Sequence, residues 1–139
     1  MNSTLKIPRP VLFARVMTLD AVVTGLTAVA MALGAGVLAS LTALPVELLR
    51  LVGLALLPFV AFVGWLSRHP SAKAGWVVAI INALYSAGCV ALVVGGWVAP
   101  NAWGVAFVLV QAVAVLAFAL AGAFALHNAP GQTRRANAL

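Results

Sequence analysis

The sequence predicts an all-α membrane protein with four transmembrane helices in an antiparallel up-down bundle. Of its 139 residues, 65% are hydrophobic and only 7% are charged, whereas a soluble domain carries about 25% charged residues. Eight basic and two acidic side chains are too few to cover a water-soluble globule. High hydrophobicity also excludes an intrinsically disordered chain. The length allows four crossings, because one helix needs about 20 residues to cross the hydrocarbon core.

Four apolar stretches supply these crossings. We expect spans at residues 17–38, 46–66, 74–98 and 102–126, which together make one transmembrane domain. Each must be helical, because lipid offers no partners to backbone polar groups. Pro45 is expected in the first turn of the second span, and Ser71 and Asn101 are the expected N-caps of the third and fourth. Pro58 should kink the second span, and a kink there is compatible with a gating role or with a purely structural one.

The basic residues predict the orientation. On one side of a four-span chain lie Lys6, Arg9, Arg15, Arg68, Lys73, Arg134 and Arg135. The other side has only Arg50, which is three residues after Glu47 and can form an ion pair with it at the outer interface. Because cytoplasmic segments are rich in Lys and Arg, both termini should be cytoplasmic. Residues 1–16 would then form a cytoplasmic or interfacial segment, and residues 127–139 a flexible cytoplasmic tail.

Small residues recur every four positions in three spans, and the first has the pairs Ala21 and Gly25, Ala30 and Gly34, and Ala32 and Gly36. The third span has Ala79, Ala83, Ala87 and Ala91, and the fourth has Ala117, Ala121 and Ala125. Such spacing lets helix backbones approach closely in lipid. The stripes are compatible with packing inside one chain and with a face for a homo-oligomer.

Polar residues inside the apolar spans indicate where function is to be sought. In the third span Asn82, Tyr85, Ser86 and Cys89 share one helical face, as do Asp20, Thr24 and Thr27 in the first. Gln111 lies near the middle of the fourth span. The candidate ligand- or ion-binding residues are therefore Asp20, Thr24, Asn82, Tyr85, Ser86 and Gln111. They could line a polar pocket that opens towards the cytoplasm, or they could only bond the helices to one another.

Asp20 is the residue on which this hypothesis depends most. If the first helix begins near Pro10, Asp20 is about two turns inside it and needs a partner such as Arg15, Asn82 or a proton. If the span begins near Thr18, the carboxyl group lies at headgroup level and only complements the helix dipole. The uncharged run begins after Asp20, which favours the shallow placement.

The sequence offers little for catalysis, so we expect a protein that is not an enzyme and has no catalytic residues, metal or cofactor. The motifs HExxH and CxxC and a Gly-rich phosphate loop are all missing. His69 and His127 fall at span ends, whereas a bis-histidine haem needs ligands within the bundle. The scattered basic residues also argue against a nucleic-acid partner.

Five segments carry a family resemblance: LDAVVTG, LPVELLRLVG, NALYSAGCV, GWVAPNAWG and VQAVAVLAFAL. With them the chain resembles, roughly from Asp20 to Leu120, an uncharacterised family of small bacterial four-helix integral membrane proteins. The resemblance implies a multi-pass protein of the bacterial inner membrane and implies no particular activity.

Two functions follow from these observations. The first is a bundle that binds or passes a small solute, ion or lipid through the intramembrane polar cluster. The second is a structural or accessory membrane protein that acts through helix association, either as a homo-oligomer or as a partner subunit. In both cases the lipid bilayer is the surrounding partner.

Overall fold

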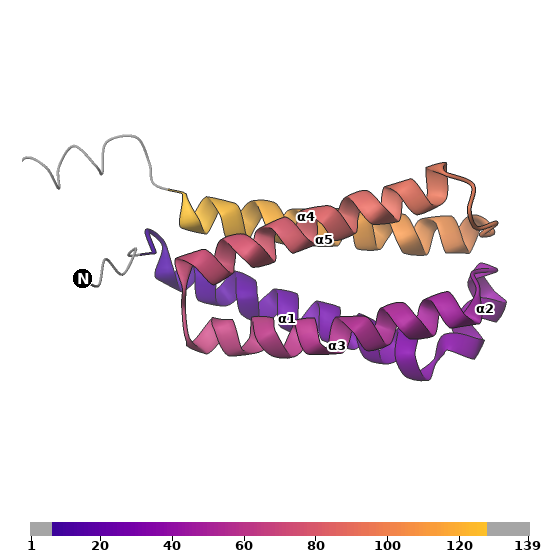
Figure 1. The fold of residues 1–139 in the computed structure, drawn as a ribbon, viewed down its shortest axis with the longest axis horizontal. Coiled ribbons are helices and arrows are strands. Elements are labelled where there is room, and N and C mark those ends of the chain that lie inside the picture. Colours follow the sequence, from indigo (N-terminus) through magenta and orange to yellow (C-terminus); the bar gives the residue numbers. More distant parts are fainter. Residues whose placement is uncertain (1–6, 128–139) are drawn as a thin grey trace, which may run out of the picture.

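A computed structural model describes residues 7–127, and every regular element in that range is helical. The helices are α1 (Pro10–Leu33), α2 (Ala35–Thr42), α3 (Val46–Arg68), α4 (Ala72–Val94) and α5 (Ala102–Leu126) (Figure 1). All except α2 are long and apolar enough to cross a membrane. The predicted all-α class with four candidate spans is therefore confirmed. The expectations for Lys6, Arg134, Arg135 and the tail after residue 127 lie outside the described residues.

The first span differs from its predicted bounds of 17–38. Helix α1 already begins at Pro10, because proline in a first helical turn has no N–H to leave unsatisfied. It ends at Leu33, where Gly34 adopts φ −98° and ψ 18° and interrupts the helical geometry. The chain then continues as α2 to Thr42, four residues beyond the predicted end of the first span. The apolar residues run across Gly34 without a break, so hydropathy alone does not reveal the division.

The other helix ends follow local chemistry. Helix α3 begins at Val46, so Pro45 is its N-cap and does not lie inside the first turn. Helix α4 ends at Val94 and not at residue 98, because Gly95 caps it and Gly96 takes the left-handed φ of +69°. Helix α5 has the bounds that were predicted for the fourth span.

Both predicted N-caps are confirmed. The hydroxyl oxygen of Ser71 accepts a hydrogen bond from the backbone N–H of Ala74 at 3.3 Å. The carboxamide oxygen of Asn101 accepts one from the N–H of Gly104 at 2.9 Å. These side chains satisfy donors that the first turn of a helix leaves free.

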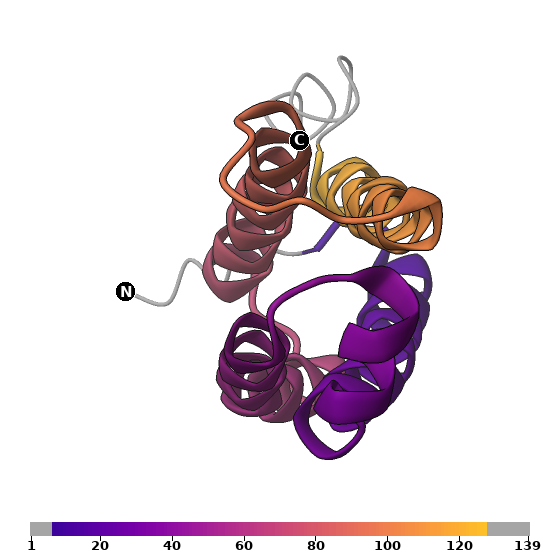
Figure 2. The ribbon, with the colours of Figure 1, turned by 90° about the vertical axis from the view of Figure 1, so that its right-hand side faces the viewer.

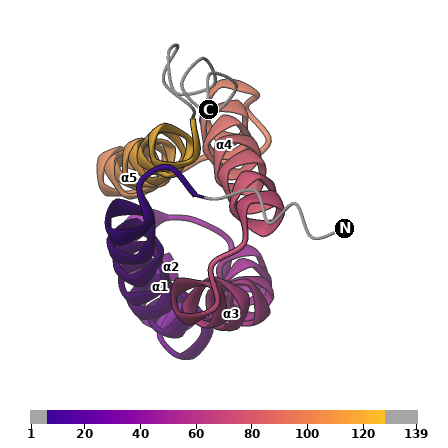
Figure 3. The same cartoon turned by 90° about the vertical axis from the view of Figure 1, so that its left-hand side faces the viewer.

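The helices form two hairpins. Helices α1 and α3 pack most extensively, with α2 between them in sequence, and α4 packs along α5. The hairpins meet mainly where α1 lies against α5, whereas α3 and α4 meet over only a few residues. Seen along the bundle in Figure 3, α1 lies between α3 and α5, so α4 is diagonally opposite α1. We name the end at which α1 begins and α5 ends the near end, and α2 lies at the far end (Figures 1 and 2).

Glycine permits the closest approach between α1 and α3. A Cβ atom on Gly53 would lie 2.5 Å from the backbone nitrogen of Ala32 and 2.9 Å from the carbonyl oxygen of Ala28. The two backbones therefore touch at this position, which is the kind of contact that small residues allow in membrane helices.

The alanine stripes are only partly buried within the chain. Ala79 and Ala125 are buried, but Ala83, Ala87, Ala91 and Ala117 are exposed in the chain. Helix α5 instead buries a neighbouring stripe, which consists mainly of Gly104, Val108, Ala112, Ala119 and Gly122. Packing inside the chain therefore holds for Ala79 and Ala125, and the alternative of a face for a homo-oligomer stays open for the exposed alanines. Several faces of α5 carry alanine, so spacing alone does not select the buried one.

The apolar core is divided into two clusters. The near-end cluster consists of Phe13, Val16, Met17, Val63, Leu66, Val78, Ala125 and Leu126. The far-end cluster consists of Met31, Ala35, Leu44, Leu49 and Val108. Between the two clusters lie the buried polar side chains of Asp20, Thr24, Asn82 and Ser86, whereas the buried Thr42 lies at the far end.

Candidate functional site

Asp20 lies deep in the bundle, near the middle of α1, and its exposed fraction is 0%. Its two carboxyl oxygens accept different hydrogen bonds. Thr24 Oγ1 donates to Oδ1 at 2.8 Å, and Asn82 Nδ2 donates to Oδ2 at 2.7 Å. Of the two expectations for Asp20, the structure has the features of the one in which the helix begins near Pro10 and the carboxyl group has a partner. Helix α1 begins at Pro10, and Asn82 supplies the partner that a deep carboxyl group requires.

The bond between Asp20 and Asn82 spans the diagonal of the bundle. The backbones of α1 and α4 do not approach each other closely, and at the near end the two helices meet through the side chain of Phe13, which packs on Gly75. Within residues 7–127 it is the only hydrogen bond that joins the two hairpins away from their ends. At the near end, Arg9 donates to the carbonyl oxygens of Phe124 at 2.7 Å and His127 at 3.0 Å. The hairpins are thus fastened both at mid-depth and at the near end.

The far end has its own connection. The backbone N–H of Asn101 donates to the carbonyl oxygen of Thr42 at 3.1 Å, and Asn101 Nδ2 donates to that of Leu41 at 2.8 Å. A Cβ atom on Gly104 would collide with the same Thr42 oxygen. Helix α2 and the start of α5 therefore touch through their backbones and close this end of the bundle.

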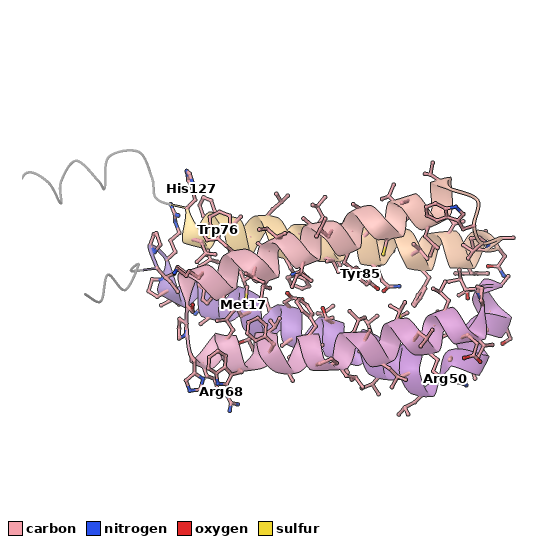
Figure 4. All side chains as sticks on the ribbon, viewed as in Figure 1. Met17, Arg50, Arg68, Trp76, Tyr85 and His127 are labelled. Atoms are coloured by element: carbon pink, nitrogen blue, oxygen red, sulfur yellow. The ribbon has the colours of Figure 1, made fainter. Side chains whose placement is uncertain are left out.

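Two other predicted residues bond within the second hairpin. Tyr85 Oη donates to Gln111 Oε1 at 2.9 Å, and Ser86 Oγ donates to the carbonyl oxygen of Ala112 at 2.8 Å. Ser86 is buried, and its hydroxyl proton is held by the α5 backbone. Its observed role is to join α4 to α5. Tyr85 and Gln111 are only partly buried, and Figure 4 places Tyr85 between the two hairpins.

A cavity of about 640 Å³ lies between the hairpins at this level, and all four long helices line it. Its walls are mostly apolar and include Val52, Pro58, Phe59, Ala114 and Val115. Its polar lining consists of Thr24, Thr27, Asn82, Tyr85 and Gln111, and none of its lining residues is charged. Four of the six predicted ligand residues therefore line one cavity, whereas Asp20 and Ser86 do not.

Asp20 does not line the cavity, but it orients Asn82, which does. A carboxyl oxygen can only accept from the amide nitrogen of Asn82, so the bond fixes which way that amide is turned. The Asn82 amide keeps its oxygen and its second N–H for other partners. Gln111 is held more loosely, because its Nε2 reaches the carbonyl oxygen of Phe107 at 3.4 Å. The cavity thus offers uncharged donors and acceptors, which suit a carbonyl or hydroxyl group.

Two further hollows continue from this cavity, and Gln111 lines all three. One, of about 260 Å³, reaches between α3 and α4 to Leu48 and Leu92. The other, of about 620 Å³, reaches between α2 and α5 to Leu41 and Trp103. Both run towards the far end, whereas the near-end cluster fills the bundle on the other side. The expected opening towards the end that holds the termini is therefore wrong.

The remaining predicted residues lie away from the cavity. Arg50 Nη1 is 3.4 Å from Glu47 Oε1, and both side chains are exposed at the far end (Figure 4). Cys89 is half-buried and lines the smaller hollow between α3 and α4. In the described part of the chain, no three His, Cys, Asp or Glu side chains are grouped as a metal ion would require.

Sequence reasoning found the polar lining but missed the apolar walls. Val52, Phe59 and Ala114 carry no signal in a chain where most residues are apolar, and only the packing shows that they face a space. In the comparisons with known proteins, no family model, no curated protein and no solved structure matches the chain.

Proposed function

We propose that this multi-pass membrane protein binds a small, uncharged and mainly apolar molecule in the cavity between its hairpins. The observation that carries the proposal is the lining. Four helices surround about 640 Å³ with apolar side chains and a few uncharged polar ones, among them Asn82 and Gln111. Ligand cavities typically occupy about 300–1,000 Å³ and combine apolar walls with a few polar groups that orient the ligand. The proposed role is binding and not catalysis.

The arrangement of the hollows supports access from the bilayer. At the near end the cavity is blocked by packed side chains such as Phe13 and Leu66, and at the far end Thr42 lies against Gly104. The hollows lie at the sides, between α3 and α4 and between α2 and α5. A molecule dissolved in lipid can enter by these routes, whereas an ion would find no charged side chain along the cavity. Among the ligand classes expected from the sequence, this favours a lipid-like molecule over an ion.

Photolabelling tests this proposal. The probe is a diazirine derivative of 1-decanol, which is uncharged and has one hydroxyl group, and its charged counterpart is the same chain ending in a carboxylate. The protein is reconstituted in phosphatidylcholine nanodiscs, and labelled peptides are identified by mass spectrometry. We expect the alcohol to label the peptides around Tyr85 and Gln111, and an excess of unlabelled decanol to suppress this labelling. The carboxylate probe should not label them.

Two alanines on α5 provide a matched pair of variants. Ala114 lines the cavity, whereas Ala117, three residues later, is exposed and outside it. Ala114→Phe should lower the competable labelling several-fold, and Ala117→Phe should leave it unchanged. Equal loss in both variants, or equal labelling by the carboxylate probe, would contradict a cavity that selects uncharged molecules.

The proposal includes a location and an orientation. The resemblance of the sequence to small bacterial four-helix proteins supports the bacterial inner membrane, and Arg9, Arg15, Arg68 and Lys73 support a cytoplasmic near end. In a Cys89→Ser background, a cysteine at Ser40 should react with a membrane-impermeant maleimide in intact cells. A cysteine at Lys73 should react only after the cells are broken. The reverse pattern would invert the orientation.

A second candidate is helix-mediated association with another membrane protein or with a second copy of this chain. It is supported by Ala83, Ala87 and Ala91, which form an exposed small-residue stripe on α4. In Cys89→Ser, a cysteine at Ala87 should give disulfide-linked dimers under mild oxidation if the stripe meets its own copy. A cysteine at the exposed Leu120 serves as the control. If both positions crosslink equally, collisions explain the dimers and the stripe loses its support.

A further inference from the structure

A separate hollow lies on the flank of α1 and α3, outside the central cavity and close to the near end. It has a volume of about 450 Å³, and its polar lining consists of Thr18, Ser67 and Arg68. A neighbouring hollow of about 420 Å³ is lined by Arg15 and also by Thr18. Because Thr18 belongs to both, the two form one surface with an arginine on each side. We name this surface the flank groove.

The two arginines of the flank groove have no acidic partner in the range 7–127, where the one ion pair joins Arg50 to Glu47 at the far end. Arg15 and Arg68 are both exposed. Arg9 differs from them, because its guanidinium group is bound to backbone carbonyl oxygens and lies 4.2 Å from the centre of the Phe124 ring. The flank groove therefore holds two positive charges that are available to an anion.

Below the arginines the flank groove becomes apolar. Its lining continues towards the middle of the bundle with Ala21, Val22, Val60 and Gly64. Gly64 has no side chain and therefore leaves space in the apolar part of the groove. A Cβ atom placed on it would lie 3.9 Å from Ala21 Cβ, which is an ordinary contact distance. Val22 and Leu19, which also line the flank groove, are exposed. A molecule that fits here has an anionic group at the level of the helix ends and a hydrocarbon chain that points into the membrane.

We propose that the flank groove binds an anionic phospholipid, with its phosphate between Arg15 and Arg68 and one acyl chain along Ala21 and Gly64. Guanidinium groups bind phosphate oxygens with two parallel hydrogen bonds, which makes arginine well suited to phosphate recognition. The hydroxyl groups of Thr18 and Ser67 lie beside the arginines as further hydrogen-bonding groups. Basic pockets between transmembrane helices on the cytoplasmic side are a recognised form of headgroup site.

Native mass spectrometry tests the flank groove. The purified chain is mixed with equal amounts of phosphatidylglycerol and phosphatidylcholine whose acyl chains differ in mass, and the lipids retained by the protein are counted. We expect phosphatidylglycerol to be retained in clear excess. Each of Arg15→Gln and Arg68→Gln should lower its retention roughly fivefold, since a basic residue at the membrane surface contributes about that factor.

The control is a double variant, Arg50→Gln with Lys73→Gln, which removes two positive charges outside the flank groove. It should keep the preference for phosphatidylglycerol, because it changes the net charge and not the site. Gly64→Leu should fill the apolar part and also reduce retention, without removing any charge. Equal retention of both lipids, or an equal loss in the control and arginine variants, would overturn the proposal. So would displacement of the lipid by millimolar inorganic phosphate, which would show a site for the free anion.

Discussion

Asn82 on α4 donates a hydrogen bond to Asp20 on α1 across the diagonal of the bundle, with 2.7 Å between Nδ2 and Oδ2. The backbones of these two helices lie apart, and at the near end they meet through the side chain of Phe13, which packs on Gly75. The bond joins the hairpins and also turns the Asn82 amide, so that one contact both holds the cavity together and presents a polar group to it. Removing either partner should therefore change stability and ligand binding together.

Replacing Asn82 should show how much this contact stabilises the fold. Asn82→Leu leaves the buried Asp20 with Thr24 as its remaining partner, and we expect the free energy of unfolding to fall by about 2 kcal/mol. Asp20→Asn keeps an acceptor of the same size and should be milder. Unfolding by SDS titration, followed by circular dichroism, measures both variants. If Asn82→Leu is as stable as Asp20→Asn, the hydrogen bond between Asn82 and Asp20 contributes little to the stability of the fold.

Gly53 is predicted to tolerate no side chain. A Cβ atom there would meet the α1 backbone at Ala32 and Ala28, which cannot move as a flexible side chain can. We expect Gly53→Ala to lower the free energy of unfolding by about 3 kcal/mol through overpacking. Gly88 in α4 has nothing within 4 Å of such an atom, so Gly88→Ala is the control and should be neutral or slightly stabilising. Similar losses in both would argue against a backbone contact between α1 and α3.

Arg9 should keep the end of α5 in place. It donates to the carbonyl oxygens of Phe124 and His127, which have no partners within the helix. Arg9→Gln should remove about 1 kcal/mol of stability and speed hydrogen exchange in the last turn of α5. Lys73→Gln, which removes an exposed charge near the same end, should leave that exchange unchanged. Unaltered exchange in Arg9→Gln would show that the α5 end is held by packing alone.

Asn101 has two separable roles. Its carboxamide oxygen caps α5, and its amide nitrogen bonds the carbonyl oxygen of Leu41 in α2. Asn101→Asp keeps the cap and loses the bond to α2, whereas Asn101→Ala loses both, so alanine should be worse by about 1 kcal/mol. Thermal unfolding in nanodiscs compares them. We also expect faster exchange in α2 for both variants, and protection of α2 in Asn101→Asp would contradict the connection.

The sequence predicted which residues belong to the polar cluster, but it did not predict what each of them contacts. Spacing put Asn82, Tyr85 and Ser86 on one face of a helix, and the structure keeps them together. It also separates them, because Ser86 bonds the α5 backbone while Asn82 and Tyr85 line the cavity. This division depends on how far α4 is rotated against α5, and that rotation is set by contacts between distant residues.

The sequence by itself determined the class, the number of candidate spans and the caps at Ser71 and Asn101, because hydropathy and capping depend on residues that are neighbours in the chain. Only the tertiary structure decided that Asp20 is buried, that Gly34 divides the first span and that the hollows run to the far end. These features depend on which helices meet and where their backbones touch. In a chain where 65% of residues are hydrophobic, almost any face can be buried, so local pattern does not choose among them.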